Sequence, residues 1–147
     1  MSARTYIIDT NVVVAGLLSS ESESPVCHIL DAMLDAKLPF LLSPALLAEY
    51  RQVLLRPRLT QLHGLEVDAI DVLLTHLTAN AIWREPPPAT SPAPDPGDNH
   101  LWSLLLLQPH TVLITGDRLL LETPPTEGTV ITAGDYISLG KTSDRPG

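Results

Sequence analysis

The chain lacks most of what an extracellular or membrane-bound protein needs. Its 147 residues include one cysteine, Cys27, which excludes an internal disulfide and a zinc site built from several cysteines. Aromatic residues make up only 4%, so aliphatic side chains must fill the interior. The longest hydrophobic run, residues 12–18, is far shorter than a membrane span, and no charged leader precedes a hydrophobic segment at the start. We therefore expect a protein of a reducing compartment, most simply the cytoplasm, with no membrane contact.

Basic side chains are also scarce. There are 9 lysines and arginines against 17 acidic residues, which gives a net charge of −8. A chain of this charge has no general attraction for nucleic-acid phosphates, and this argues against a simple DNA-binding module. The argument is weaker against an enzyme that binds metal cations with clustered carboxylates, because those carboxylates are part of the count.

Short hydrophobic runs alternate with amphipathic stretches along the chain. Strands are expected at residues 5–8, 40–42, 81–83, 111–115 and 129–132, and helices at 11–18, 24–36, 43–56, 65–78 and 98–107, with a short helix after Asp117. Pro57 is expected to end the third helix. This alternation predicts an α/β fold with a parallel sheet covered on both faces.

The length and the hydrophobic content of 44% indicate one domain with a real core, which we place at residues 1–141. Six prolines within residues 84–97 predict a long surface loop inside that domain. Residues 142–147 are expected to form a frayed tail.

Two aspartates follow predicted strands directly. Asp9 comes after the first strand, and Asp117 comes just past the strand at 111–115. In an open α/β sheet, functional groups collect beyond the carboxyl ends of strands where the strand order reverses. If the two strands are neighbours, both carboxylates lie at one edge. The alternative is that each aspartate only caps the helix that follows it.

Two further acids lie in unusual helical positions. Glu49 borders a hydrophobic stripe on its helix, where a glutamate more often reaches outward to water. Asp98 opens the most hydrophobic helix of the chain, where it or Asp95 could serve as a cap. Four carboxylates brought close together would repel one another unless cations neutralise them. Mg²⁺ or Mn²⁺ prefers such oxygen ligands, and one or two ions can activate water against a phosphodiester.

The four acids lie in four short motifs, which are in chain order Asp9-Thr10-Asn11, Glu49 within Leu47-Ala48-Glu49-Tyr50, Asp95-Pro96-Gly97-Asp98-Asn99 and Thr115-Gly116-Asp117. Together these motifs resemble the PIN-domain ribonucleases, in particular the branch of toxin components of toxin–antitoxin pairs related to VapC-like toxins. The resemblance covers about residues 6–121. It implies a three-layer α/β/α sandwich with a central parallel sheet and metal-dependent hydrolysis of RNA.

The resemblance also implies roles for particular residues. The acidic quartet of the family, which binds Mg²⁺ or Mn²⁺ and is catalytic, falls on Asp9, Glu49, Asp98 and Asp117. Asn11 and Thr115 match positions that orient the carboxylates or a bound water. Proteins of this branch form homodimers and are held silent by a cognate antitoxin protein.

The chain departs from the family pattern at Leu119, where relatives often carry another acid. For binding RNA the sequence offers Arg51, Arg56 and Arg58, with Arg118 beside Asp117. The first three could equally be a solvated helix end that interacts favourably with the helix dipole.

Two other functions stay open. A catalytically weak domain that binds a partner protein would fit the acidic surface and Leu119. An aspartate-based phosphatase or phosphoacceptor domain would use Asp9 as nucleophile, but Asn11 stands where such enzymes usually need a second aspartate. The histidines show no ligand spacing, and His100 is expected to lie on a helix surface.

Overall fold

The computed structural model describes residues 4–143, and within them the chain forms five strands and eight helices. The strands are β1 (Thr5–Ile8), β2 (Leu41–Leu42), β3 (Ile82–Trp83), β4 (Thr111–Ile114) and β5 (Thr129–Ile131). The helices are α1 (Thr10–Leu18), α2 (Pro25–Leu34), α3 (Pro44–Leu54), α4 (Pro57–His63), α5 (Val67–Asn80), α6 (Asn99–Leu105), α7 (Arg118–Glu122) and α8 (Ala133–Ser143). A single 3₁₀ turn, η1 (Pro96–Asp98), precedes α6.

The strands pair in parallel, and their order reverses beside β1. β1 pairs with β4 and β4 with β5, while β2 pairs with β3. A parallel bridge between Tyr6 and Phe40 joins the two sets, so the spatial order is β3-β2-β1-β4-β5. The chain therefore fills one side of β1 first and the other side afterwards. This reversal places the switch point of the sheet between the carboxyl ends of β1 and β4.

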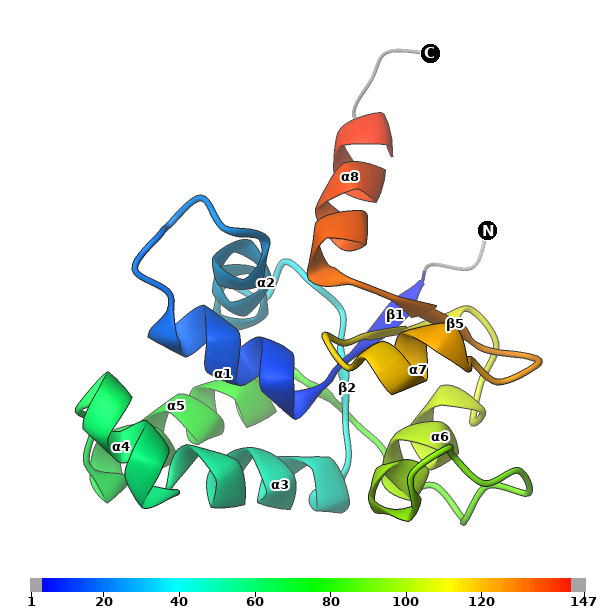
Figure 1. Ribbon diagram of the computed structural model, residues 1–147, viewed down its shortest axis with the longest axis horizontal. Helices are drawn as coiled ribbons and strands as arrows, with labels where there is room; N and C mark the ends of the chain where they lie inside the picture. Colours follow the sequence, from blue (N-terminus) through cyan, green and yellow to red (C-terminus); the bar gives the residue numbers. More distant parts are fainter. Residues whose placement is uncertain (1–3, 144–147) are drawn as a thin grey trace.

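Helices cover both faces of this sheet, as the predicted three-layer α/β/α architecture requires. In Figure 1, α2 and α8 lie above the strands, and α3 and α6 lie below them. The central strands are accordingly buried on both faces: Ile7, Ile8, Leu113 and Ile114 have no exposed surface. Such continuous hydrophobic strands are typical of parallel sheets, and the α/β fold with a central parallel sheet is confirmed.

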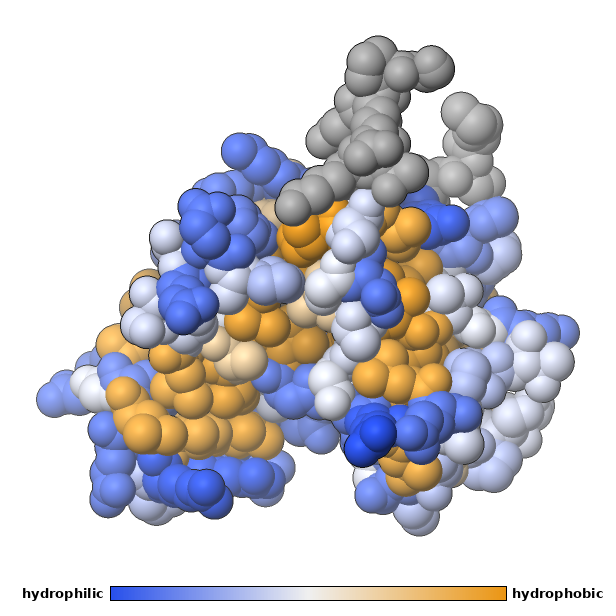
Figure 2. Space-filling model, turned by 45° about the horizontal axis from the view of Figure 1, so that its top comes forward, coloured by the Kyte–Doolittle hydropathy of each residue, from blue (hydrophilic) through white to orange (hydrophobic). Residues whose placement is uncertain are grey.

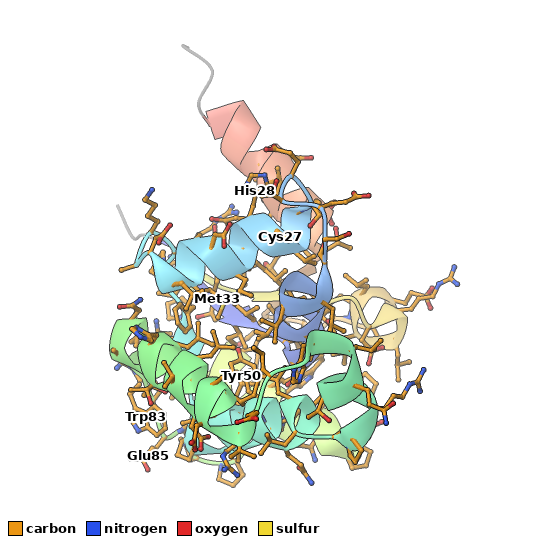
Figure 3. The ribbon with its side chains drawn as sticks, turned by 90° about the vertical axis from the view of Figure 1, so that its left-hand side faces the viewer. Cys27, His28, Met33, Tyr50, Trp83 and Glu85 are labelled. Carbon is orange, nitrogen blue, oxygen red and sulfur yellow. The ribbon has the colours of Figure 1, made fainter. Side chains whose placement is uncertain are left out.

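Aliphatic side chains form the interior with few aromatic ones. Figure 3 shows Met33 of α2 and Tyr50 of α3 pointing inward from helices on either side, and both are fully buried. The Tyr50 hydroxyl donates a hydrogen bond to the backbone carbonyl of Ile8 at the end of β1. This bond ties α3, which carries Glu49, to the strand that carries Asp9.

Helices α1 and α2 approach each other closely at Gly16. A Cβ atom built there would lie 2.7 Å from the carbonyl oxygen of Val26 and 3.0 Å from Cβ of Leu30. The Cys27 thiol also donates to the Gly16 carbonyl at 3.5 Å. The absence of a side chain at residue 16 therefore sets the spacing of these two helices.

Two helices were not predicted, and several boundaries differ from the sequence prediction. The third helix ends at Leu54, and Pro57 begins α4 instead of a loop, since proline fits the first turn of a helix. The helix α8 was not predicted, although Thr132 and Asp135 form a reciprocal capping box at its start. It extends to Ser143, so the first two residues of the expected tail are helical, and residues 144–147 lie outside the described part.

The surface mixes hydrophilic residues with hydrophobic patches on the face that Figure 2 shows. The proline-rich segment has neither helix nor strand from residue 84 to residue 95, where η1 follows. Among the residues that the structure describes, no helix has the length and hydrophobicity needed to cross a membrane.

Candidate active site

Asp9 lies at the end of β1, where the buried strand gives way to α1. Its side chain is 5% exposed and accepts hydrogen bonds from the backbone N–H of Thr10 and the hydroxyl of Thr115, both at 2.8 Å. Burial raises the pKa of Asp9, and the negative charges of Glu49 and Asp117 raise it further. The hydrogen bonds act in the opposite direction. Asp9 is therefore a buried carboxylate that hydrogen bonds fix in place, and a nearby cation would stabilise its negative charge.

Thr115 and Asn11 connect Asp9 to the turn after β4. The side-chain amide of Asn11 donates to Asp9 Oδ2 at 3.2 Å and to Thr115 Oγ1 at 3.3 Å. Its oxygen accepts from the backbone N–H of Gly116 at 2.9 Å. The N–H of Asp117 in turn donates to Thr115 Oγ1 at 2.9 Å. These bonds fix the Thr115-Gly116-Asp117 turn against the start of α1.

Asp117 also caps the helix that follows it, as the alternative interpretation proposed. Its Oδ1 accepts from the N–H of Leu119 at 2.9 Å, at the start of α7. Asp9 likewise occupies the N-cap position of α1. Capping and a role in the site are compatible, because a carboxylate has about four lone-pair sites and the cap bond of Asp9 or Asp117 uses only one of them.

Glu49 comes to the site from α3 and does not reach outward to water. The hydroxyl of Thr10 donates to its Oε2, and Nε2 of His100 lies 3.7 Å from its Oε1. The contact with His100 is the main cause that lowers the pKa of Glu49. Its side chain is 30% exposed, so it remains accessible from the solvent.

Asp98 differs from Asp9 and Asp117 because no capping bond among the described residues uses its side chain. Asp95 caps η1 through the N–H of Gly97 at 2.9 Å, whereas α6 has no side-chain cap from Asp98. Partial burial raises the pKa of Asp98 from 3.8 to about 6, and the charges of Asp9, Asp95 and the other acids contribute to the rise. Its carboxylate is free to bind something else.

All four acids line one cleft of about 530 Å³, together with Thr10, Asn11, Arg56 and hydrophobic side chains of α1 and α3. The structure thus brings together the four residues that the sequence placed at positions 9, 49, 98 and 117. Among the described residues, however, no three carboxylate, histidine or cysteine side chains are arranged closely enough to hold a metal ion between them. The acids share a cleft without forming a closed coordination shell.

The four arginines expected to bind RNA are separated by the fold. Arg56 lines the cleft, and its charge acts on Glu49. Arg51 pairs with Asp71 of α5 at 2.8 Å, outside the cleft, and Arg118 pairs with Glu122 along α7 at 3.2 Å. Arg58 lies exposed on α4 and does not line the cleft. Only Arg56 of this set therefore adds positive charge to the lining of the site.

His100 is the site residue that the sequence interpretation missed. It was expected on a helix surface, but its side chain is only 21% exposed and lies against Glu49. Its buried Nδ1 atom has no hydrogen-bond partner among the described residues. The spacing of histidines in the sequence does not predict this contact, because His100 reaches Glu49 only when α6 packs against α3.

The family of the chain follows from comparison with known proteins. The family model described as PIN domain matches residues 5–119, and the chain belongs to this family. Its structure is similar to the PIN domain of T. brucei RRP44, with a TM-score of 0.57, 16% sequence identity and coverage of 97% of this chain and 83% of that one. At this identity the likeness concerns the fold. No curated protein gives a significant match.

PIN domains are typically nucleases, and they generally use divalent metal ions. The switch point of the sheet, where the chain places its acids, is where a domain of this architecture binds ligands. The family thus agrees with the chemistry that the cleft offers.

Proposed function

We propose that this protein is a Mg²⁺- or Mn²⁺-dependent endoribonuclease that hydrolyses RNA phosphodiesters. The observation that carries the proposal is the shared cleft, in which acids from four distant segments face one another across the switch point of the sheet. A protein that used these acids only as helix caps would have no reason to place Glu49 and Asp98 among them, because neither side chain makes a capping hydrogen bond.

The donor set fits a hard divalent cation. Carboxylate oxygens, with an amide and hydroxyls nearby, are the ligands that Mg²⁺ and Mn²⁺ prefer, and neither ion needs all its ligands from the protein. Burial raises the pKa values of Asp9 and Asp98, and the negative charges of the neighbouring acids raise them further. Asp9, Glu49, Asp98 and Asp117 would hold the ion, which when bound supplies a water of lowered pKa and charge stabilisation at the phosphate.

The remaining residues of the site would position and bind. Asn11 and Thr115 keep the Asp9 carboxylate and the Asp117 turn in place through the hydrogen bonds described above. Thr10 and His100 hold Glu49 from opposite oxygens. Arg56 would attract the RNA backbone, because it is the arginine of the predicted set that lines the cleft.

Cleavage of a labelled RNA tests this proposal. Wild type should cleave with Mg²⁺ or Mn²⁺ and stop with EDTA, whereas Asp9→Asn should lose activity under both conditions. Asp31→Asn, which removes an exposed carboxylate on α2, is the matched control and should cleave like wild type. Unchanged cleavage by Asp9→Asn would overturn the role of the carboxylates.

The setting that we propose for this activity is a toxin–antitoxin pair, with the chain as the homodimeric toxin and a cognate antitoxin as its inhibitor. Support comes from the motif resemblance alone. Co-expression with the product of the neighbouring open reading frame should restore growth to cells that this chain arrests. Arrest that persists with every neighbouring product would contradict the pairing.

A protein-binding module without catalysis is the second candidate. It is favoured by the lack of three closely grouped ligands among the described residues and by Leu119, which is 45% exposed where an acid is expected. Calorimetric titration with Mn²⁺ separates the two functions. The nuclease should take up Mn²⁺ in the cleft and lose this binding in Asp98→Asn, whereas the binding module should show no such uptake.

A further inference from the structure

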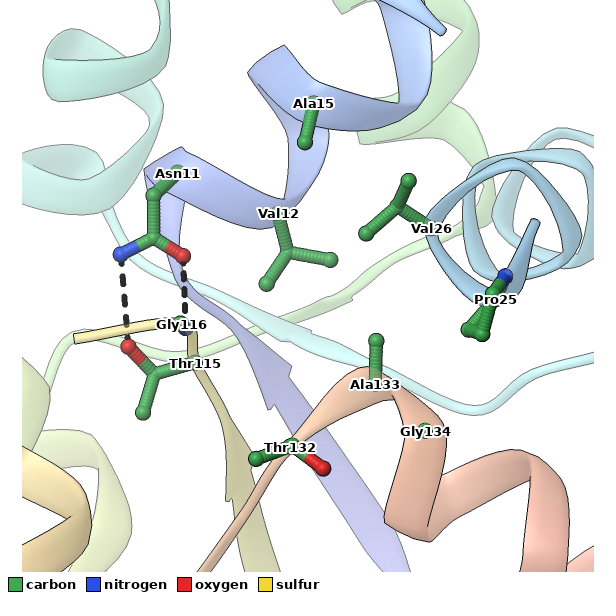
Figure 4. A pocket seen from close by; sticks show the side chains of 10 residues that line it. All are labelled: Asn11, Val12, Ala15, Pro25, Val26, Thr115, Gly116, Thr132, Ala133 and Gly134. Atoms are coloured by element: carbon green, nitrogen blue, oxygen red, sulfur yellow. Dashed lines mark hydrogen bonds between the residues drawn. The ribbon is translucent and has the colours of Figure 1, made fainter. Parts of the chain in front are cut away.

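A second hollow adjoins the acidic cleft, and no part of the proposed hydrolysis uses it. It has a volume of about 390 Å³ and lies between the first turns of α1 and α2, the turn after β4 and the start of α8. Figure 4 shows Val12, Val26 and Ala133 pointing into it from three different elements. This volume falls within the range of about 300–1,000 Å³ that is usual for small-molecule sites.

The hollow and the acidic cleft share a wall. Asn11 and Ala15 line both of them, so the two are continuous along α1. The Asn11 side chain is fixed by its bonds to Asp9, Thr115 and Gly116, and it separates the carboxylates from the hollow. Anything that extends from a phosphate held at the acids toward α2 enters the hollow next.

The lining of the hollow is chemically unlike that of the cleft. None of the residues that line it carries a charge, and most of the lining is aliphatic. Thr132 contributes a hydroxyl that accepts from the N–H of Asp135 at 3.0 Å and can still donate. An uncharged, largely aliphatic site with an available donor suits a flat, neutral heterocycle and does not suit a phosphate.

The charge of the protein gives a reason for such a site. With a net charge of −8, and with Arg51 and Arg118 paired to carboxylates, attraction for phosphates is weak outside the cleft. Contacts with bases would then supply a larger share of the affinity for RNA. Bases become available in single-stranded segments, where they can be splayed out of the stack and buried against side chains.

We propose that this hollow binds one unstacked base of single-stranded RNA, next to the phosphate that is cleaved. The inference rests on the proposed nuclease function and adds a determinant of substrate choice. The base enters between α1 and α2 on one side and the start of α8 on the other, and Asn11 lies between it and the acids.

Two kinds of change test this proposal: removal of single bases from the RNA, and substitutions that fill the hollow in the protein. RNA affinity is measured by fluorescence anisotropy in EDTA, which stops cleavage, with oligonucleotides that carry one abasic residue at successive positions around the cleavage site. In wild type, one position should weaken binding by about 5-fold or more, because the base that is buried against the aliphatic lining is lost. The other positions should change it little.

Ala133→Phe fills the hollow from α8 without touching the acids, and Leu139→Phe, at an exposed position of α8 outside the hollow, is the matched control. Ala133→Phe should bind the intact RNA as weakly as wild type binds the critical abasic RNA, with no further loss from that abasic residue. Val26→Phe, which fills the hollow from α2, should do the same and guards against misfolding of either variant. Cross-links from 4-thiouridine at the critical position should map to the elements around the hollow.

Each other result has a definite meaning. If wild type cleaves RNA but no abasic position matters, or if both filled variants keep full sensitivity, the base site is refuted and the nuclease stands. If the filled variants bind RNA normally but lose inhibition by an antitoxin protein, the occupant is a protein and the inference is wrong. If wild type neither binds nor cleaves any RNA, the proposed function fails together with it.

Discussion

Asp98→Asn should make the metal-free protein more stable, because it removes a charge that the fold disfavours. The pKa of Asp98 rises from 3.8 to about 6, a shift of about two units. At about 1.36 kcal/mol per unit, this corresponds to about 3 kcal/mol for a fully buried group. Asp98 is partly exposed, and solvent screens its interactions, so we expect a gain of about 1 kcal/mol.

The sign of the effect depends on pH. The folded-state pKa lies above the unfolded value, so the ionised form costs stability at every pH above about 6. As pH falls from about 6 to about 4, wild type takes up the proton and the cost disappears. The advantage of Asp98→Asn should therefore be complete at pH 7.5 and absent below pH 4.

Urea unfolding in EDTA at both pH values measures this difference. At pH 7.5, the gain should also appear as a rise in melting temperature of about 2–4 °C for a domain of this size. Asp31→Asn, an exposed acid on α2, should change neither value. If Asp98 binds the proposed ion, the order should reverse in saturating Mg²⁺, because the ion would then stabilise wild type more than the variant. A variant that is no more stable at pH 7.5, or equally more stable at pH 4, would refute the electrostatic argument.

Three further outcomes are expected. Thr115→Val, which removes the hydroxyl that donates to Asp9, should lower Mn²⁺ affinity or RNA cleavage by about 10- to 100-fold, while Thr115→Ser should not. Calorimetry and cleavage kinetics measure these quantities, and equal losses in the two variants would contradict the role of the hydroxyl. Tyr50→Phe should lower the free energy of unfolding in urea by about 1–3 kcal/mol, because the Ile8 carbonyl loses its buried donor. Tyr136→Phe is the control, and an equal loss in both variants would show that the bond is unimportant. Arg56→Ala should weaken RNA binding and reduce the slope of log affinity against log salt by about 1, whereas Arg51→Ala, whose side chain pairs with Asp71, should leave both nearly unchanged. Identical slopes in the two variants would remove Arg56 from the site.

The sheet and the positions of Asp9 and Asp117 at its edge were predictable because they depend on local patterns, whereas Glu49 and Asp98 were assigned through the family resemblance. The strands around Ile7 and Leu113 are continuous hydrophobic runs, as buried parallel strands must be, and Asp9 and Asp117 follow them directly. That Asp9 and Asp117 lie close together could be expected from a general property of such sheets, since functional groups gather where the strand order reverses.

What the sequence did not reveal depends on contacts between helices. The position of His100 against Glu49 requires α6 to pack near α3, and no spacing in the chain encodes this. Arg51 lies on α3 and pairs with Asp71 of α5, whereas Arg56 follows the end of α3 as the N-cap residue of α4, so their different places depend on how these helices pack and where α4 begins. The helix α8 was missed although its capping box is visible in the sequence, because glycines at positions 134 and 140 weaken the helical pattern.

The pairing of β1 with β4 has a consequence for the order of synthesis. Asp9 is made 106 residues before Thr115, the residue whose hydroxyl holds it. While a ribosome is still elongating the chain, β1 has no β4 beside it, and the four acids have no common cleft. The active site that we propose therefore cannot form until most of the polypeptide has been translated.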